Sequence, residues 1–188
     1  VWYEGRVMRD DNSHTRKMVS LLAYKEQLRR LHDDTSYELY ADNLVYLTET
    51  SEDNFVKKDL IYSILDKRPK RADVYWFVTV NVTDQPYTAE YKTNTYGTDY
   101  IVNVQLYLGF RMNQQVNVFL RQIVGDLMHS GELHHQPQKY TTMPGRNVGD
   151  FSFVIVQEEL SPETQINGLA KVLIRARLWI QKNTISPA

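Results

Sequence analysis

The stretch DKRPKRADVYWFVTVNVTDQP, residues 66–86, places four basic residues directly before an alternating run of apolar side chains. Between residues 74 and 82, one set of alternate positions holds only valine and tryptophan, and the other set begins with tyrosine and phenylalanine. A strand that is apolar on both faces is typical of the centre of a sheet that is covered on both sides. The stretch therefore predicts a central strand that begins beside a cluster of positive charge.

The residues before this strand predict two helices and one further strand. Leucines at an approximately helical spacing predict a helix over 16–32, and a short apolar run predicts a strand over 43–50. A second helix is expected over 53–65, with Phe55 on its buried face, Asp53 or Asn54 as its cap and Pro69 as its end.

The residues after the central strand continue the alternation of strands and helices. Residues 83–100 predict a turn-rich connection or an edge hairpin, in which Gly97 is the most flexible point. A strand whose inward face ends at Phe110 follows, then a helix over 114–130, a loop over 134–150, a strand over 151–159 and a helix that opens at Ser161. This order predicts an α/β or α+β fold, with a central sheet of about four to five strands and helices packed on it.

The composition narrows the class of protein. The 188 residues carry a net charge of −1, which argues against a general nucleic-acid binder. No stretch approaches the roughly 20 consecutive apolar residues of a membrane-spanning helix, so we expect a soluble domain. The absence of cysteine excludes disulfides and thiolate metal sites, and fits a reducing compartment.

The sequence holds no recognisable catalytic or metal-binding motif. It lacks the glycine-rich loops of dinucleotide-binding and P-loop proteins, so neither site is supported. His129, His134 and His135 lack the spacing of metal ligands, which favours a solvated loop. Asp99 and Asp126 stand as single carboxylates with no evident partner. We therefore expect no enzyme, no metal and no cofactor; a small enzyme acting on phosphate esters would need an acid–base pair that the sequence does not display.

Two regions have the residue types that bind phosphate. The segment NTYGTDY, 94–100, offers hydroxyl groups, backbone N–H groups and tyrosine rings, and Arg111 and Arg121 follow it in the chain. The second region is the basic cluster before the central strand, which consists of Lys67, Arg68, Lys70 and Arg71. Each feature also has a structural explanation, because tyrosine and threonine favour strands and exposed arginines are commonly solvated. Basic residues near a membrane can instead contact anionic lipid headgroups.

Several stretches together resemble one family. NLVYLT at 43–48, the long segment at 60–88, the segment at 94–124 and MPGRNVGDFSFVIV at 143–156 resemble the C-terminal cytoplasmic domain of KUP-type potassium uptake proteins from Gram-positive bacteria. YWFVTV at 75–80 followed by YLGF at 107–110 is the most telling part, although many family members have RYGF in the second position. The resemblance covers most of residues 37–160.

The resemblance implies a part of a potassium–proton symporter in the cell membrane, with this domain on the cytoplasmic side. Residues 1–36 would form a junction that follows the last transmembrane helix, plus a helical segment, and residues 37–188 would form the regulatory domain. Trp2, Tyr3, Arg6 and Arg9 suit such a junction, because aromatic and basic residues gather where a helix leaves a membrane. The ion-binding residues of the family lie in helices that this chain does not contain.

In some Gram-positive members similar domains bind cyclic di-AMP, and this binding inhibits potassium import. The resemblance therefore implies a homodimer whose interface binds that nucleotide, since a two-fold ligand suits a two-fold interface. The alternative is a dimerisation domain of the same transporter that takes no ligand. The candidate residues for the nucleotide are Arg68, Lys70, Arg71, Tyr75, Tyr96, Thr98, Arg111, Asn117 and Arg121.

Overall fold

The protein is built around one mixed five-stranded sheet. The computed structural model describes residues 18–48, 54–66, 68–112, 115–136 and 148–154. The strand order in the sheet is β5-β6-β4-β2-β7, and only β5 runs antiparallel to its neighbour. The strands are β2 (Leu39–Thr48), β4 (Arg71–Thr83), β5 (Ala89–Asn94), β6 (Ile101–Gly109) and β7 (Phe151–Val154).

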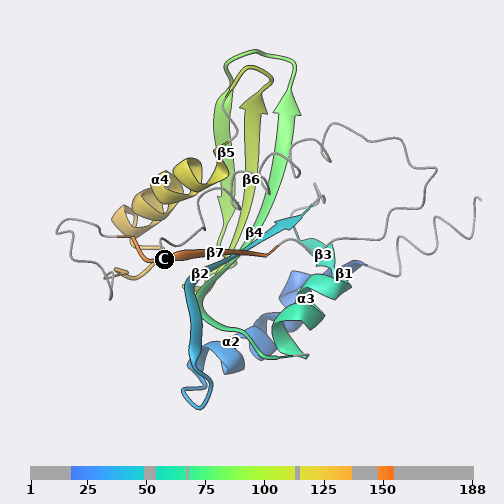
Figure 1. Ribbon diagram of the computed structural model, residues 1–188, viewed down its shortest axis with the longest axis vertical. Coiled ribbons are helices and arrows are strands. Elements are labelled where there is room, and N and C mark those ends of the chain that lie inside the picture. Colours follow the sequence, from blue (N-terminus) through green and yellow to red (C-terminus); the bar gives the residue numbers. More distant parts are fainter. Residues whose placement is uncertain (1–17, 49–53, 67, 113–114, 137–147, 155–188) are drawn as a thin grey trace, which may run out of the picture.

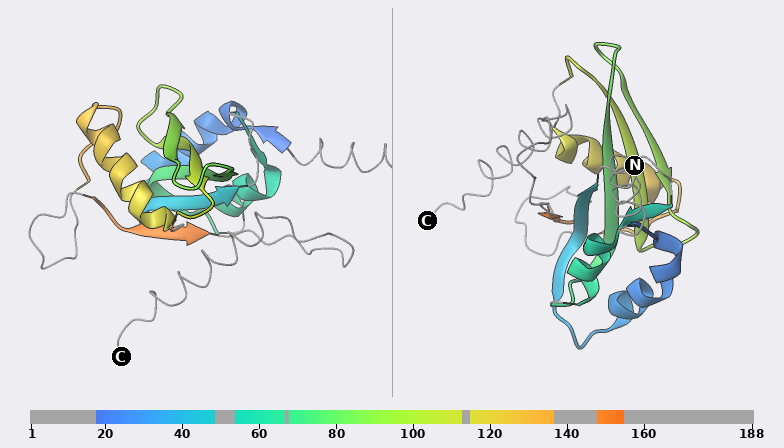
Figure 2. Two further views of the ribbon diagram at one scale, coloured as in Figure 1. Left: turned by 90° about the horizontal axis from the view of Figure 1, so that it is seen from above. Right: turned by 90° about the vertical axis from the view of Figure 1, so that its right-hand side faces the viewer.

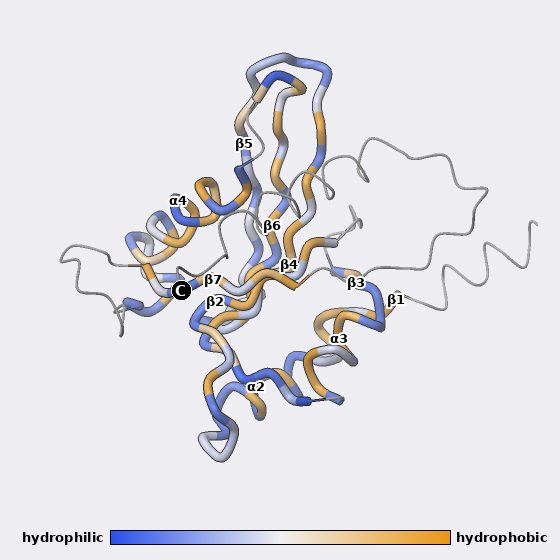
Figure 3. The backbone as a smooth tube through the Cα atoms, viewed as in Figure 1, coloured by the Kyte–Doolittle hydropathy of each residue, from blue (hydrophilic) through white to orange (hydrophobic). Residues whose placement is uncertain are grey.

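Helices cover both faces of this sheet, as Figures 1 and 2 show. On one face α4 (Val116–His129) packs against Trp76 and the valines of β4. On the other face α2 (Lys25–Asp33) and α3 (Lys58–Leu65) pack against Tyr75 and Phe77 of the same strand. Both faces of β4 are buried, and its tube is largely hydrophobic in Figure 3. The predicted central strand and the α/β fold class are therefore confirmed.

A small second sheet lies beside α3. Strand β1 (Met18–Ser20) pairs antiparallel with β3 (Phe55–Lys57), and a 3-10 turn, η1 (Leu21–Tyr24), leads from β1 into α2. The prediction of one helix over 16–32 is therefore wrong for its described first residues, because pairing with β3 holds them extended. Leu21 is buried while the next residue, Leu22, is 48% exposed.

The second predicted helix begins later than expected. Its first described residues form β3, and α3 starts after Lys57, which makes no capping bond with its side chain. Phe55 is 42% exposed rather than buried. Asn54 instead accepts a hydrogen bond at its main-chain oxygen from the N–H of Leu21. The helix ends at Leu65, before Pro69 is reached.

The remaining elements follow the predictions more closely. Residues 83–100 contain the edge strand β5, and α4 lies within the predicted 114–130. Phe110 was expected to face inward but is 56% exposed, because β6 ends one residue before it. Strand β7 begins where predicted, whereas residues 155–159, the expected last helix and most of the loop over 134–150 lie outside the described residues.

The described part of the first 36 residues shares the core of the main sheet. Leu21, Leu28 and Leu31 belong to the same apolar cluster as Tyr75 and Phe77. The proposed boundary at residue 37 stays a prediction, and the structure packs the segment before it directly onto the sheet.

A fully buried group of polar side chains joins three distant parts of the chain. The Asn43 and Gln136 amides bond each other twice, at 2.8 and 3.0 Å. The indole N–H of Trp76 donates to the same Asn43 oxygen at 2.9 Å, and the N–H of Gly149 donates to Gln136 at 3.3 Å. Because buried polar groups are costly when unpaired, this group fixes the position of the segment after α4 against β2 and β4.

Gly109, at the end of β6, leaves room for the turn that precedes β5 to pass close to it. A Cβ atom on Gly109 would lie 2.4 Å from the carbonyl oxygen of Pro86, which is far inside contact distance. The N–H groups of Gly109 and Arg111 bond the carbonyls of Thr88 and Pro86, at 2.7 and 3.1 Å. The end of β6 is thereby tied to the start of β5.

We expect the substitution Asn43→Leu to lower the free energy of unfolding by about 3 kcal/mol, since it leaves Trp76 and Gln136 without their partners inside the core. Urea unfolding followed by circular dichroism measures this change. The same amide-to-leucine change at the exposed Gln27 is the control and should shift stability little. A loss at Asn43 no larger than that at Gln27 would contradict the role given to the buried polar group.

Burial raises the pKa of Tyr46 to about 12. The neutral phenol is therefore favoured in the folded state, and its stabilisation is complete below the ordinary tyrosine pKa of about 10. As the pH rises from about 10 to about 12, the unfolded state ionises first, so this residue should reduce stability by about 1.4 kcal/mol per pH unit.

Tyr46→Phe should flatten that decline in urea unfolding measured across this range. Tyr87→Phe, at a residue that is 67% exposed, is the control and should leave the slope as it is. Identical slopes for the two variants would count against the role of Tyr46.

Candidate functional site

The basic cluster lies where β4 begins, but its members have different environments. Arg68 is exposed, whereas Lys70 is partly buried and donates from its ammonium group to the main-chain carbonyl of Ser63. Burial lowers the pKa of Lys70. The Nε of Arg71 donates to the carbonyl of His32 at 3.0 Å, and Lys67 lies outside the described residues.

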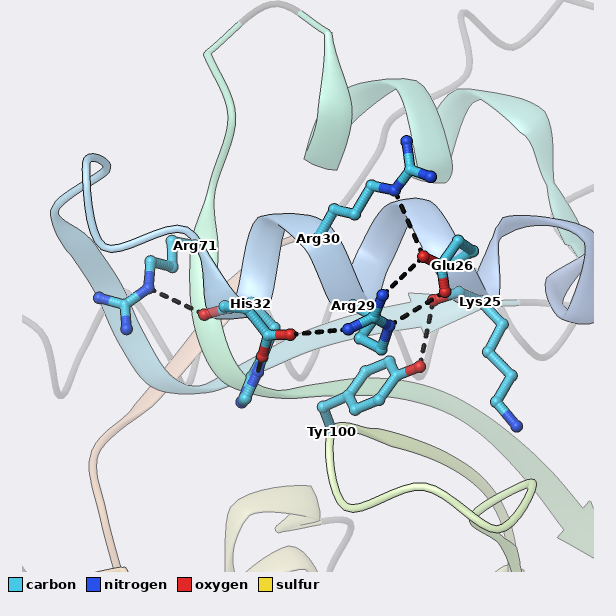
Figure 4. Close-up of polar contacts among 8 residues, drawn as sticks. Lys25, Glu26, Arg29, Arg30, His32, Arg71 and Tyr100 are labelled. Atoms are coloured by element: carbon cyan, nitrogen blue, oxygen red, sulfur yellow. Dashed lines mark hydrogen bonds and ion pairs between the residues drawn. The ribbon is translucent and has the colours of Figure 1, made fainter.

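Arg71 ties β4 to the end of α2, as Figure 4 shows. Next to this contact, His32 bonds Asp33 at 2.8 Å, and Arg29 bridges Asp33 and Glu26. Hydrogen bonding to Arg29 is the main reason that the pKa of Glu26 falls to about 2. The terminal nitrogens of Arg71 point away from His32 in Figure 4.

Tyr75 belongs to the core. Its side chain is fully buried, and its hydroxyl donates to the carbonyl of Lys70 at 3.1 Å and accepts from the N–H of Ala72 at 3.3 Å. Burial raises the pKa of Tyr75. In this conformation its ring offers no face to a nucleotide, and its role is to hold the start of β4 in place.

Tyr96 and Thr98 form the turn between β5 and β6. Tyr96 has a φ of 52°, and its hydroxyl accepts from the side-chain amide of Asn103 at 2.9 Å. The hydroxyl of Thr98 donates to the carbonyl of Thr95 at 2.8 Å and accepts from the N–H of Ile101 at 3.1 Å. Lys25 donates to the main-chain oxygen of Tyr96 at 3.0 Å, which joins the turn to α2.

The remaining candidates lie elsewhere. Arg111 follows the far end of β6, is exposed, and lies over the Phe110 ring at 5.9 Å. Asn117 and Arg121 are on α4; the side-chain oxygen of Asn117 is buried, and Arg121 lies over the ring of Phe151 at 5.8 Å. Because β4 and β6 are parallel, the basic cluster and the Tyr96 turn share one end of the sheet, whereas Arg111 is at the other.

The exposed Tyr40 is an aromatic neighbour of the basic cluster that the sequence analysis missed. It is 54% exposed and follows Leu39, which pairs with Arg71 in the ladder of β2 and β4. The signal for it was weak, because its role depends on the parallel pairing of two strands that are far apart in sequence. We call Arg68, Arg71 and Tyr40 the basic–aromatic surface.

A cavity of about 270 Å³ opens at the same end of the sheet. Its polar side chains come from α2, from the first half of β2 and of β4, from the turn before β6 and from the segment after α4, and they are His32, Asp42, Asp73, Asp99, His134, His135 and Gln136. The three carboxylates repel phosphate, so an anionic ligand would bind outside this cavity.

Two carboxylates that the sequence analysis treated as unpartnered have partners. Asp99 pairs with His134, with 3.0 Å between the carboxylate oxygen and Nδ1. Asp126 accepts a hydrogen bond from the hydroxyl of Tyr91 at 2.5 Å. Neither partner was evident in the sequence, because the folding of distant segments creates these pairs.

Within the described ranges, no group of three or more histidine and acidic side chains has the arrangement that a metal ion requires. In the same part of the chain, every helix is too short or too polar to cross a bilayer.

The chain is similar to curated potassium transport proteins along its whole length. It is 64% identical over 188 residues to a probable potassium transport system protein Kup of Lacticaseibacillus casei, and 59% identical over 192 residues to that of Latilactobacillus sakei. A third relative, from Lactobacillus gasseri, is 54% identical. All of the chain is covered in each comparison, but it spans only 28% of the length of these relatives.

No solved structure shows a significant match to the chain. The family model described as the K+ potassium transporter C-terminal domain matches residues 41–188, which is most of the chain. The match is to a domain of a transport protein and not to an enzyme family. The chain belongs to the family of potassium transporter C-terminal domains.

Proposed function

We propose that this chain is the cytoplasmic regulatory domain of a membrane potassium–proton symporter, and that it binds cyclic di-AMP as a homodimer to inhibit potassium import. The transporter part of the proposal is supported by the family match and by the names of the relatives. The nucleotide part is supported by one observation above all, which is the presence of Arg68, Arg71 and Tyr40 at one end of the central strands.

The basic–aromatic surface has the chemistry that a cyclic dinucleotide needs. Arg71 uses its Nε on His32, and its two terminal nitrogens can form a fork with phosphate oxygens. Arg68 adds a second exposed cation three residues earlier, and the half-exposed ring of Tyr40 offers a face on which a base can stack. The acidic cavity nearby keeps phosphate on this outer surface.

Regulation then follows from a difference in affinity between two states. If the nucleotide binds one arrangement of the dimer more tightly, it increases the population of that arrangement. The transporter attached to that arrangement of the dimer would be the inhibited one. Nucleotide binding and the inhibition of transport would then be linked by one coupling free energy.

We expect calorimetric titration of the chain with cyclic di-AMP to detect binding. Arg68→Ala and Arg71→Ala should each weaken it by about tenfold or more, because bonds from a guanidinium group to a phosphate contribute about 1.5–3 kcal/mol.

Arg30→Ala is the matched control, because its side chain is 76% exposed on the outer face of α2. It should leave the affinity as it is. No heat and no thermal shift at high ligand concentration would remove the nucleotide from the proposal, and unchanged affinity in both test variants would move the site to other residues.

Within the described part of the chain, β5 has a neighbour on one side only, and this edge supports a second candidate function, a dimerisation domain of the same transporter that takes no ligand. Light scattering of the dilute chain distinguishes the two. A stable dimer that shows no response to cyclic di-AMP favours this second function.

A further inference from the structure

Strand β5 ends the sheet with a regular, exposed edge. Among the described residues its only neighbour in the sheet is β6, and five of its six residues are exposed. It contains neither proline nor a bulge, which are features that commonly protect edge strands from pairing. Figure 1 shows β5 at the margin of the sheet, in the part that extends beyond the helices.

The alternation of hydrogen bonds along β5 identifies which main-chain groups face outward. Gly109 donates to the carbonyl of Thr88 directly opposite, so this pair bonds β6, and every second pair after it does the same. The residues between them, Ala89, Tyr91 and Thr93, therefore direct their N–H and C=O groups away from β6. They form a short row of donors and acceptors along the free edge.

The charges on β5 select one way of pairing this row with a second copy. An antiparallel pair centred on Tyr91 aligns Ala89 with the partner's Thr93 and Tyr91 with the partner's Tyr91, which uses all of the outward groups. The same register sets Glu90 opposite the partner's Lys92, twice by symmetry. A register centred on Glu90 or on Lys92 would instead set like charges opposite each other, which destabilises a sheet.

The side chains of β5 divide cleanly between the two faces. Glu90 and Lys92 pair with Tyr107 and Gln105 of β6, and Lys92 lies over the Tyr107 ring at 5.6 Å. Tyr91 lies on the opposite face, where its hydroxyl bonds Asp126 of α4.

We propose that two copies of this chain associate through β5, in an antiparallel pair centred on Tyr91, to form one continuous sheet. The molecule that pairs with this edge is thus a second copy of the chain, and we infer this from the charge pattern of Glu90 and Lys92. This interface belongs to the isologous class, in which the same patch serves both partners.

The pairing also brings together candidates that one copy keeps apart. In this register, Asn94 at the end of one β5 lies opposite the partner's Thr88, and the N–H of Arg111 bonds the carbonyl of Pro86, two residues before Thr88, within each copy. The partner's Arg111 therefore comes near the Tyr96 turn. The idea that Tyr96 and the partner's Arg111 contact one phosphate rests on the proposed function. The pairing of β5 is argued from the edge strand alone.

Charge exchange tests the interface, with sedimentation velocity of the chain as the measurement. Glu90→Lys and Lys92→Glu should each weaken dimerisation by about tenfold, because each places like charges opposite at two symmetric positions. The double variant Glu90→Lys/Lys92→Glu restores opposite charges and should recover the dimer. A charge change at the exposed Gln122 of α4, Gln122→Lys, is the control and should have no effect.

Cysteine cross-linking tests the register, and the chain has no cysteine of its own to interfere. Opposed residues of a pair that is not hydrogen-bonded have Cα atoms about 4.5 Å apart, which a disulfide spans. A mixture of the Glu90→Cys and Lys92→Cys proteins should therefore form a mixed disulfide. Each protein alone should cross-link poorly, since its two cysteines would be diagonal neighbours about 7–8 Å apart.

Several results would overturn the inference. A monomer at all concentrations would do so, as would a dimer that both single charge variants leave intact. Equal cross-linking in the mixture and in the single proteins would reject the register. Titration of cyclic di-AMP into the charge variants separates the two proposals, because a dimer through β5 without nucleotide binding removes only the proposed function.

Discussion

The burial of both faces of β4 is the constraint on which the rest of the structure depends. Tyr75 and Phe77 face one apolar cluster, and Trp76 and Val78 face the other, so the strand needs cover on each side. α4 supplies one cover, and α2 with α3 supplies the other. The polar groups at the start of the strand are positioned by the same arrangement, since Arg71 and Tyr75 bond main-chain atoms close to where β4 begins.

The sequence was informative wherever a local pattern coincided with the packing. The alternation in β4 predicted its central position, and the pattern over 114–130 predicted α4. The prediction failed where pairing with a distant strand prevailed over local periodicity. Both β1 and β3 lie in segments with a helical pattern, and each is extended because the other is present.

The candidate site was harder to predict, because the type of a residue does not tell in which direction its side chain points. Arg71 and Tyr75 are four residues apart in one strand, yet the first is only partly buried and the second is fully buried. Tyr40 joins the basic residues only through the parallel ladder, and Asp99 meets His134 only because the segment after α4 returns to the sheet. Such contacts depend on topology, which local sequence patterns do not specify.

The bonds between Asn43 and Gln136 span 93 positions in the chain. A ribosome must therefore make most of the domain before the amide of Asn43 finds its final partner, the amide of Gln136. Parallel strands with long connections also fold slowly, because distant segments must meet before any of their contacts form. The nascent chain thus passes through a stage in which Asn43 can bond the indole of Trp76 but not yet Gln136, and completion of the buried polar group waits for the late arrival of Gln136.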